Sequence, residues 1–250
     1  MSALDLYNHP SAQYAQRVER AIALLRDVAA THPRLTQASS LGVEDVVVTH
    51  LIHLAGIRSR IFVLETGRLH PETLALIPQI EQRYGRTIDR YHPVQEEVVH
   101  FVRTEGDDAM FRSVGLRKAC CELRKMEPLS RALAGVDGWI TGLRREQSNA
   151  RAEAAEVVQE PGRVKVSPLV DWTWGDVWHF VAEHQLAYNP LHDQFFPSIG
   201  CEPCTRAISV GEDFRAGRWW WEQDNAKECG LHVQPAASSL PTPRTERNPA

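Results

Sequence analysis

Residues 34–55, RLTQASSLGVEDVVVTHLIHLA, decide the fold of this chain. The segment opens with Arg34–Ala38, which predicts a short strand. A turn of small and hydroxyl-bearing residues follows at Ser39–Gly42. Val43–Ala55 then predicts a helix. A strand that leads through a short turn into a helix is the repeating unit of α/β proteins.

The same alternation continues along the chain. Further strands are predicted at Arg60–Leu64, Thr87–Tyr91 and Trp139–Thr141, and a hairpin at Val157–Val158 and Val164–Val166. Further helices are predicted at Ser11–Ala30, Pro71–Tyr84, Gln95–Arg103, Cys120–Leu133 and Trp174–His184, with an interruption near Pro128. Alternating strands and helices predict an α/β fold with a mostly parallel sheet flanked by helices.

Length and composition limit the domain organisation. The chain has 250 residues, of which 43% are hydrophobic and 24% charged, as in ordinary globular domains. We expect a single domain over residues 1–233, whose C-terminal part, about residues 210–233, is a mobile segment carrying Cys229. Residues 234–250 are rich in Pro, Ala, Ser and Thr and predict a disordered tail.

Charge and hydropathy exclude some classes of partner. The net charge of −4 provides no basic field for nucleic acid. The longest apolar run, within Val46–Gly56, is interrupted by histidines and is too short to span a membrane. The N-terminal residues lack the pattern of a signal peptide. We therefore expect a cytoplasmic protein, whose cysteines are ligands or reactive thiols rather than disulfides.

The five cysteines form a pattern of two pairs and a single residue. Cys120 and Cys121 are adjacent, Cys201 and Cys204 form a C-x2-C pair, and Cys229 stands alone. Four thiolates match the ligand count of a zinc site or an iron–sulfur cluster. Neighbours on a helix project about 100° apart, so an adjacent pair serves a bulky cluster better than one small zinc ion. The pattern favours a cluster.

Other interpretations of the cysteines stay open at this point. Either pair taken alone could consist of buried core residues. The C-x2-C pair could be a thioredoxin-like redox motif, although it comes late in the chain. Cys229 has Lys227 and His232 nearby, which favours a reactive thiolate, but an inert exposed cysteine fits this stretch equally well.

Three segments directly follow predicted strands, where α/β proteins bind their ligands. They are Ser39–Asp45, Glu65–His70 and Gly142–Arg151. The first offers hydroxyls, a glycine and a helix N-terminus to a phosphate, or it is a plain turn with a serine cap. Basic residues gather near these segments and near the cysteines: Arg112, Arg117, Lys118, Arg124, Lys125, Arg144, Arg145, Arg151, Arg215 and Arg218. Arginine suits phosphate and sulfate oxygens, whereas a single exposed arginine is ordinarily only surface charge.

Five stretches, in this order, resemble the assimilatory adenylyl-sulfate and phosphoadenylyl-sulfate reductases. They are SSLGVED (39–45), ETGRLH (65–70), ITGLRREQS (140–148), DVW (176–178) and ECGLH (228–232). The chain departs from the family at Leu41, where an aromatic residue is common. The resemblance implies a Rossmann-like fold of the adenine-nucleotide hydrolase type.

The resemblance also implies an activity and its residues. The family reduces a sulfonucleotide, here adenylyl sulfate, to sulfite and AMP through an S-sulfocysteine intermediate on Cys229. Its cluster-bearing branch holds one 4Fe–4S cluster, here on Cys120, Cys121, Cys201 and Cys204. The substrate-binding residues that it implies are Ser39, Ser40, Gly42, Thr66, Gly67, Arg68, Lys125, Gly142, Arg144, Arg215, Arg218 and His232.

The expected reductant is an external thioredoxin, because the chain has no room for a fused thioredoxin-like domain, and a homo-oligomer is expected from the family. Alternatives stay open. The enzyme could instead reduce phosphoadenylyl sulfate, or both nucleotides. A non-catalytic regulator that carries a cluster is a second class. A pyrophosphate-cleaving ligase or RNA thiolase on the related fold is a third, but it would need a Ser-Gly-Gly-x-Asp-Ser loop, which Ser39–Asp45 is not.

Overall fold

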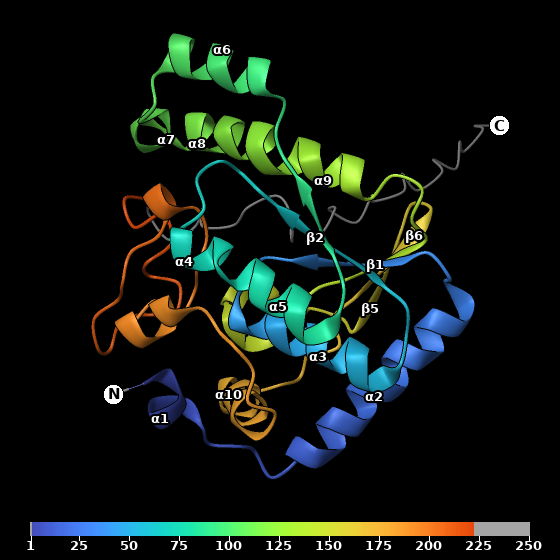
Figure 1. The fold of residues 1–250 in the computed structure, drawn as a ribbon. Helices are drawn as coiled ribbons and strands as arrows, with labels where there is room; N and C mark the ends of the chain where they lie inside the picture. The colour runs from blue at the N-terminus through green and yellow to red at the C-terminus, as the bar shows by residue number, and fades with distance from the viewer. Residues whose placement is uncertain (1, 223–250) are drawn as a thin grey trace, which may run out of the picture.

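The computed structural model describes residues 2–222 (Figure 1). The predicted nucleophile Cys229, the predicted ligand His232 and the predicted tail over 234–250 lie outside the described residues. Within them, no helix is both long and apolar enough to cross a lipid bilayer.

Six strands form one mixed sheet in the order β3-β2-β1-β4-β6-β5. They are β1 (Leu35–Ser39), β2 (Arg60–Leu64), β3 (Ile88–Tyr91), β4 (Gly138–Ile140), β5 (Val157–Glu160) and β6 (Arg163–Val166). All neighbouring pairs are parallel except β5 and β6, which form the predicted antiparallel hairpin. The predicted α/β class and its mostly parallel sheet are confirmed.

Helices cover both faces of the sheet (Figure 1). They are α1 (Ala3–Tyr7), α2 (Tyr14–Thr31), α3 (Val43–Ala55), α4 (Pro71–Leu74), α5 (Leu76–Tyr84), α6 (Gln95–Glu105), α7 (Ala109–Arg112), α8 (Val114–Cys121), α9 (Glu127–Ala132) and α10 (Trp174–Glu183). Helices α2, α3, α5 and α10 lie on one side of the sheet, and α8 and α9 lie on the other.

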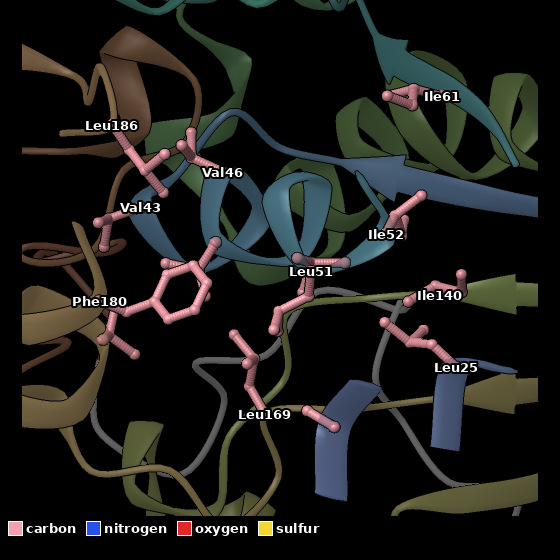
Figure 2. Close-up of a cluster of buried hydrophobic side chains, with 14 of the residues drawn as sticks. Leu25, Val43, Val46, Leu51, Ile52, Ile61, Ile140, Leu169, Phe180 and Leu186 are labelled. Atoms are coloured by element: carbon pink, nitrogen blue, oxygen red, sulfur yellow. The ribbon is translucent and has the colours of Figure 1, made fainter. Parts of the chain in front are cut away.

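The core has one part on each face of the sheet. The larger part packs α2, α3 and α10 against the strands, with Leu25, Leu51 and Phe180 fully buried (Figure 2). On the opposite face, Phe62 packs with Leu129 and Trp139. Because successive strand residues point to opposite faces, a strand buried on both sides needs a continuous apolar run, and Ile61–Leu64 has one.

Two predicted helices differ from the structure. The helix predicted over Cys120–Leu133 begins earlier, at Val114, and passes through a π-helical turn at Glu122–Met126 before α9. Pro128 lies in the first turn of α9, where proline is tolerated. The helix predicted over Pro71–Tyr84 is divided at Ala75 into α4 and α5.

The parallel strands end together and so define the functional edge. In β1, Ser39 lies opposite Val63 of β2, and Gln37 lies opposite Ile140 of β4. The segments that follow these three strands therefore meet at one edge of the sheet, as the sequence predicted for an α/β protein.

A buried carboxylate ties the N-terminal segment to α10. Asp176 is fully buried in the first turn of α10. It accepts hydrogen bonds from the backbone N–H of Ser11 at 2.7 Å and of Thr173 at 3.0 Å, and it pairs with Arg17. Thr173 caps the helix in return through the N–H of Asp176.

We expect Asp176→Ala to lower the free energy of unfolding by about 3 kcal/mol, because it removes a helix cap and leaves buried donors without an acceptor. Urea unfolding measures this change. The matched control is Asp27→Ala, which alters an exposed carboxylate of α2 and should cost less than about 0.5 kcal/mol. Equal costs for the two variants would show that Asp176 does not hold this junction.

Candidate functional site

A cavity opens at the carboxyl edge of the sheet, and we call it the sheet-end cavity. Its lining includes Ser39, Ser40 and Gly42 after β1, Thr66 after β2, Thr141 and Gly142 after β4, and the cations Lys125, Arg151, Arg215 and Arg218. The residues implied after β1, along with Thr66, Gly142 and the three implied cations Lys125, Arg215 and Arg218, thus meet around one space.

Asp45 organises the loops of this cavity. Its carboxylate accepts hydrogen bonds from the N–H and the hydroxyl of Ser40, at 2.7 and 2.6 Å, and from the N–H of Gly142 at 2.9 Å. A Cβ on Gly142 would lie 2.7 Å from the Asp45 carboxylate, so this position requires glycine. One side chain on α3 therefore fixes the loops after β1 and β4 relative to each other.

Burial raises the pKa of Asp45 to about 6 from its ordinary value of 3.8, although the hydrogen bonds from Ser40 and Gly142 act in the opposite direction. Near neutral pH the side chain is a carboxylate, which its three hydrogen bonds require. Leu41 lies in the same loop with a φ of 61° and is fully buried in the core. The aliphatic residue at this position of the motif thus packs inward.

Arg218 forms the most constrained part of the basic wall. Its guanidinium donates to the Ser198 hydroxyl and the Ile199 carbonyl, both at 3.3 Å, and lies 4.7 Å from the centre of the Trp219 ring. A Cβ on Gly200 would lie 2.4 Å from that guanidinium. These contacts hold a buried cation in the cavity wall, where planar arginine suits phosphate or sulfate oxygens.

Arg144 does not line the sheet-end cavity. It is 1% exposed, donates to Glu44 at 3.1 Å, and lies 5.2 Å from the centre of the Trp174 ring. The resemblance implied a substrate contact for Arg144, but in the structure this side chain is buried behind the residues that line the cavity. There its guanidinium fixes Glu44, which does line the cavity.

The four paired cysteines lie around a second space, the four-cysteine chamber. Cys120 and Cys121 at the end of α8 face Cys201 and Cys204, together with Arg68, Arg117, Arg124, Lys125 and Trp219. All four are free thiols. Two pairs that are 80 residues apart in the sequence therefore share one site.

Thr66, Gly67 and Arg68 follow β2 and differ in which of the two spaces they reach. The Thr66 hydroxyl is 3.3 Å from the Cys201 sulfur. Gly67 has a φ of 72°, a left-handed conformation that favours glycine. Arg68 lines the four-cysteine chamber and pairs with Asp107. Thr66 thus reaches both spaces, whereas neither Gly67 nor Arg68 lines the sheet-end cavity.

The electrostatics of the four-cysteine chamber are uneven. Burial raises the pKa of Cys204 to about 12. Burial acts in the same direction on Cys201, but Lys125, the Thr66 hydroxyl and Arg218 outweigh it and lower the pKa of that thiol. The side of the chamber nearest Lys125 therefore favours a thiolate, the form that binds metals.

The four-cysteine chamber gathers the side chains that the implied cluster would need, and the cluster itself stays a prediction. Within residues 2–222, no three His, Cys, Asp or Glu side chains form a group that could hold one metal ion. Cys120 and Cys121 are neighbours at the end of α8, and helix neighbours project about 100° apart. A larger inorganic core can reach thiolates that a single ion cannot.

Sequence reasoning missed some residues of the cavity wall. Asp45 stood within a quoted motif without an assigned role, and no signal distinguished it from a solvated first-turn acid. His192 lines the cavity, and burial lowers its pKa to about 4, so its imidazole is neutral. Gln147 lines it too and accepts a hydrogen bond from Arg151. Their positions depend on packing that no local pattern encodes.

Comparisons with known proteins show what the chain is similar to. Residues 34–207 match the family model described as phosphoadenosine phosphosulfate reductase domain. The chain is 51% identical to the adenosine 5'-phosphosulfate reductase of Burkholderia cepacia over 88% of this chain and 89% of the relative. It is 50% identical to that of Allochromatium vinosum over 93% of this chain and 92% of the relative.

Solved structures resemble the fold. The phosphoadenylyl-sulfate reductase from Candida auris, in a phosphate complex, superimposes with a TM-score of 0.62 at 26% identity, over 76% of this chain and 92% of that one. The NMN synthetase from Francisella tularensis gives a TM-score of 0.52 at 12% identity, over 71% of this chain and 73% of that one. The latter likeness concerns the fold alone.

We expect Asp45→Asn to change how stability depends on pH. Because the folded protein binds the Asp45 proton more tightly than the unfolded chain does, this group favours folding at low pH, and the advantage disappears as the pH rises from about 4 through about 6. The free energy of unfolding of wild type minus that of Asp45→Asn should therefore fall by roughly 2–3 kcal/mol over that interval. Urea unfolding at several pH values measures it, and parallel pH profiles would contradict the burial effect.

Proposed function

The chain belongs to the phosphoadenosine phosphosulfate reductase family, and from that premise we propose that it reduces adenylyl sulfate to sulfite and AMP. The observation that carries the proposal is a cationic cavity directly beside four paired cysteines, in a chain about half identical to adenosine 5'-phosphosulfate reductases. The enzyme is an oxidoreductase that acts on a sulfur group.

The cavity suits the charge of this substrate. Adenylyl sulfate contains a phosphate–sulfate anhydride, in which anionic oxygens surround an electrophilic sulfur. Lys125, Arg215 and Arg218 line the cavity and would neutralise these oxygens and the departing AMP phosphate. Such cations lower the barrier to a thiolate that must approach through negative charge.

Cys229 is the proposed nucleophile. The other four cysteines line the chamber, so Cys229 is left to react. It lies seven positions after Glu222, the last described residue. Seven extended residues span at most about 24 Å, and the chain approaches the cavity nearby, since Trp219 lines it.

The reaction proceeds in three displacements. The Cys229 thiolate attacks sulfur and forms an S–S bond, while the S–O bond breaks and AMP departs with its electron pair. A thiolate of thioredoxin then attacks the Cys229 sulfur and releases sulfite. This leaves a mixed disulfide between Cys229 and thioredoxin. The second thioredoxin thiol attacks it, forms the thioredoxin disulfide and frees the Cys229 thiolate, so the dithiol supplies both electrons. External thioredoxin is part of the proposal.

One 4Fe–4S cluster on Cys120, Cys121, Cys201 and Cys204 is the proposed cofactor. The four free thiols around a single chamber fit this group. When bound, it would supply structural linkage and local charge rather than the electrons of the reaction. Lys125 lines both the chamber and the cavity and would present its ammonium to the substrate from beside the ligands.

We also propose a cytoplasmic location, because thiols that must stay reduced need a reducing compartment. A homo-oligomer is proposed from the family resemblance. A second candidate activity, the reduction of phosphoadenylyl sulfate, is favoured by the fold shared with the Candida auris enzyme. Comparing turnover of the two nucleotides with one thioredoxin decides between them.

After a single turnover without reductant, Cys229 should gain about 80 daltons, the mass of a sulfonate group. Intact-protein and peptide mass spectrometry measure this adduct with adenylyl sulfate and with its 3'-phosphorylated form. Cys229→Ser should bind AMP normally and form neither adduct nor sulfite. Sulfite release by this variant would remove Cys229 from the mechanism, and an adduct only with the phosphorylated nucleotide would reverse the substrate preference.

The Cys201→Ser protein should contain no bound iron and should lack the absorption at roughly 400 nm that an iron–sulfur cluster gives. The matched control is Cys229→Ser, which should keep both. Absorption spectra and iron analysis of anaerobically purified proteins measure this. A colourless wild type that contains zinc would defeat the cofactor proposal.

A further inference from the structure

A fully buried ion pair joins the four-cysteine chamber to the last described residue. The Arg117 guanidinium donates to both carboxylate oxygens of Glu222, at 2.7 and 2.9 Å. The two side chains are 1% and 3% exposed. A two-pronged pair of this kind fixes direction as well as distance.

The Arg117 side chain also lines the four-cysteine chamber. It lies on α8, one helical turn before Cys121, and its side chain also hydrogen-bonds the Cys121 thiol. Its guanidinium lies 4.6 Å from the centre of the Trp219 ring. One side chain therefore contacts a proposed cluster ligand, an aromatic wall and Glu222.

The backbone around Glu222 is tied to the C-x2-C arm as well. The N–H of Glu222 donates to the Trp219 carbonyl at 2.9 Å, and the N–H of Trp219 donates to the Cys204 carbonyl at 3.2 Å. Trp219 has a φ of 44° and is 1% exposed. A bulky residue holds this left-handed conformation only where its surroundings dictate it.

Trp219 also lies between the two spaces of the site, since it lines both the chamber and the cavity. Arg117 lies against its ring from the chamber side, and Arg218, which lines the cavity, also contacts the ring. The turn from Trp219 to Glu222 is thus linked to both pairs of cysteines, to Cys121 through Arg117 and to Cys204 through the backbone. The next residues of the chain lead to Cys229.

We propose that Arg117 and Glu222 are positioning residues that anchor the start of the Cys229 segment to the four-cysteine chamber. With both cysteine pairs held as ligands, this anchor would set the point from which the chain continues toward Cys229. The inference rests on the cluster and the nucleophile of the proposed function. It gives the cluster a role in aligning Cys229 without any transfer of electrons.

The test uses trypsin cleavage after Arg218, which is buried four residues before Glu222 and reports on release of this turn without requiring catalysis. Glu222→Gln keeps the size of the side chain and removes its charge. In iron-loaded protein it should be cleaved at least about tenfold faster than wild type, because cleavage follows the population of released segment. Glu156→Gln, which alters a carboxylate paired with Arg20 away from the site, is the control and should match wild type.

Iron removal tests the link to the chamber. In wild type it should accelerate cleavage after Arg218 to a similar degree, whereas in Glu222→Gln it should change the rate by less than about twofold. The same response to iron removal in both proteins would overturn the inference. So would equal cleavage of iron-loaded wild type and Glu222→Gln.

Two further measurements separate anchoring from general damage. Arg117→Lys keeps the positive charge but cannot donate to both carboxylate oxygens of Glu222 as a guanidinium does. It should give an intermediate cleavage rate, and this test remains available if Glu222→Gln fails to fold. AMP affinity should stay within about twofold of wild type, while adduct formation on Cys229 slows. A wild type that forms no adduct defeats the proposed function, whereas faster cleavage of Glu222→Gln would still support the anchor.

Discussion

The site depends on the three hydrogen bonds that the Asp45 carboxylate accepts. They join the loop after β1 to the loop after β4, two segments about 100 residues apart in the sequence. Because the carboxylate is buried, water cannot replace these bonds, and losing one would leave an unsatisfied group. The relative position of these two loops at the cavity therefore depends on one buried acid.

The fold was largely predictable because its signals are local. Short apolar runs such as Arg60–Leu64 give strands buried on both faces, and Val43–Ala55 begins and ends as predicted. The π-helical turn at Glu122–Met126 was not predictable from periodicity, because an added residue in one turn leaves no apolar pattern of its own. That turn nevertheless carries Lys125, which lines both spaces of the site.

The sequence predicted which residues belong to the candidate site better than it predicted what each residue does there. The cysteine pairs, the serines and the arginines stand in recognisable motifs, so the sequence could identify them. Whether an arginine faces a ligand or another residue depends on distant partners. Arg144 pairs with Glu44, 100 positions away, and Arg68 pairs with Asp107. Neither pairing follows from local spacing.

Arg144 and Arg218 show how burial and partners determine what a cation can do. Arg144 contacts two carboxylates, those of Glu44 and Glu146, so its charge is already balanced. Among the described residues, the hydrogen-bond and ring partners of Arg218 are the Ser198 hydroxyl, the Ile199 carbonyl and the Trp219 ring, and none of them is a carboxylate. Its charge also acts on the Cys201 thiol. A buried charge without a carboxylate partner is costly. A bound phosphate or sulfate would supply the missing negative charge, and the free energy recovered on pairing would then favour substrate binding at Arg218.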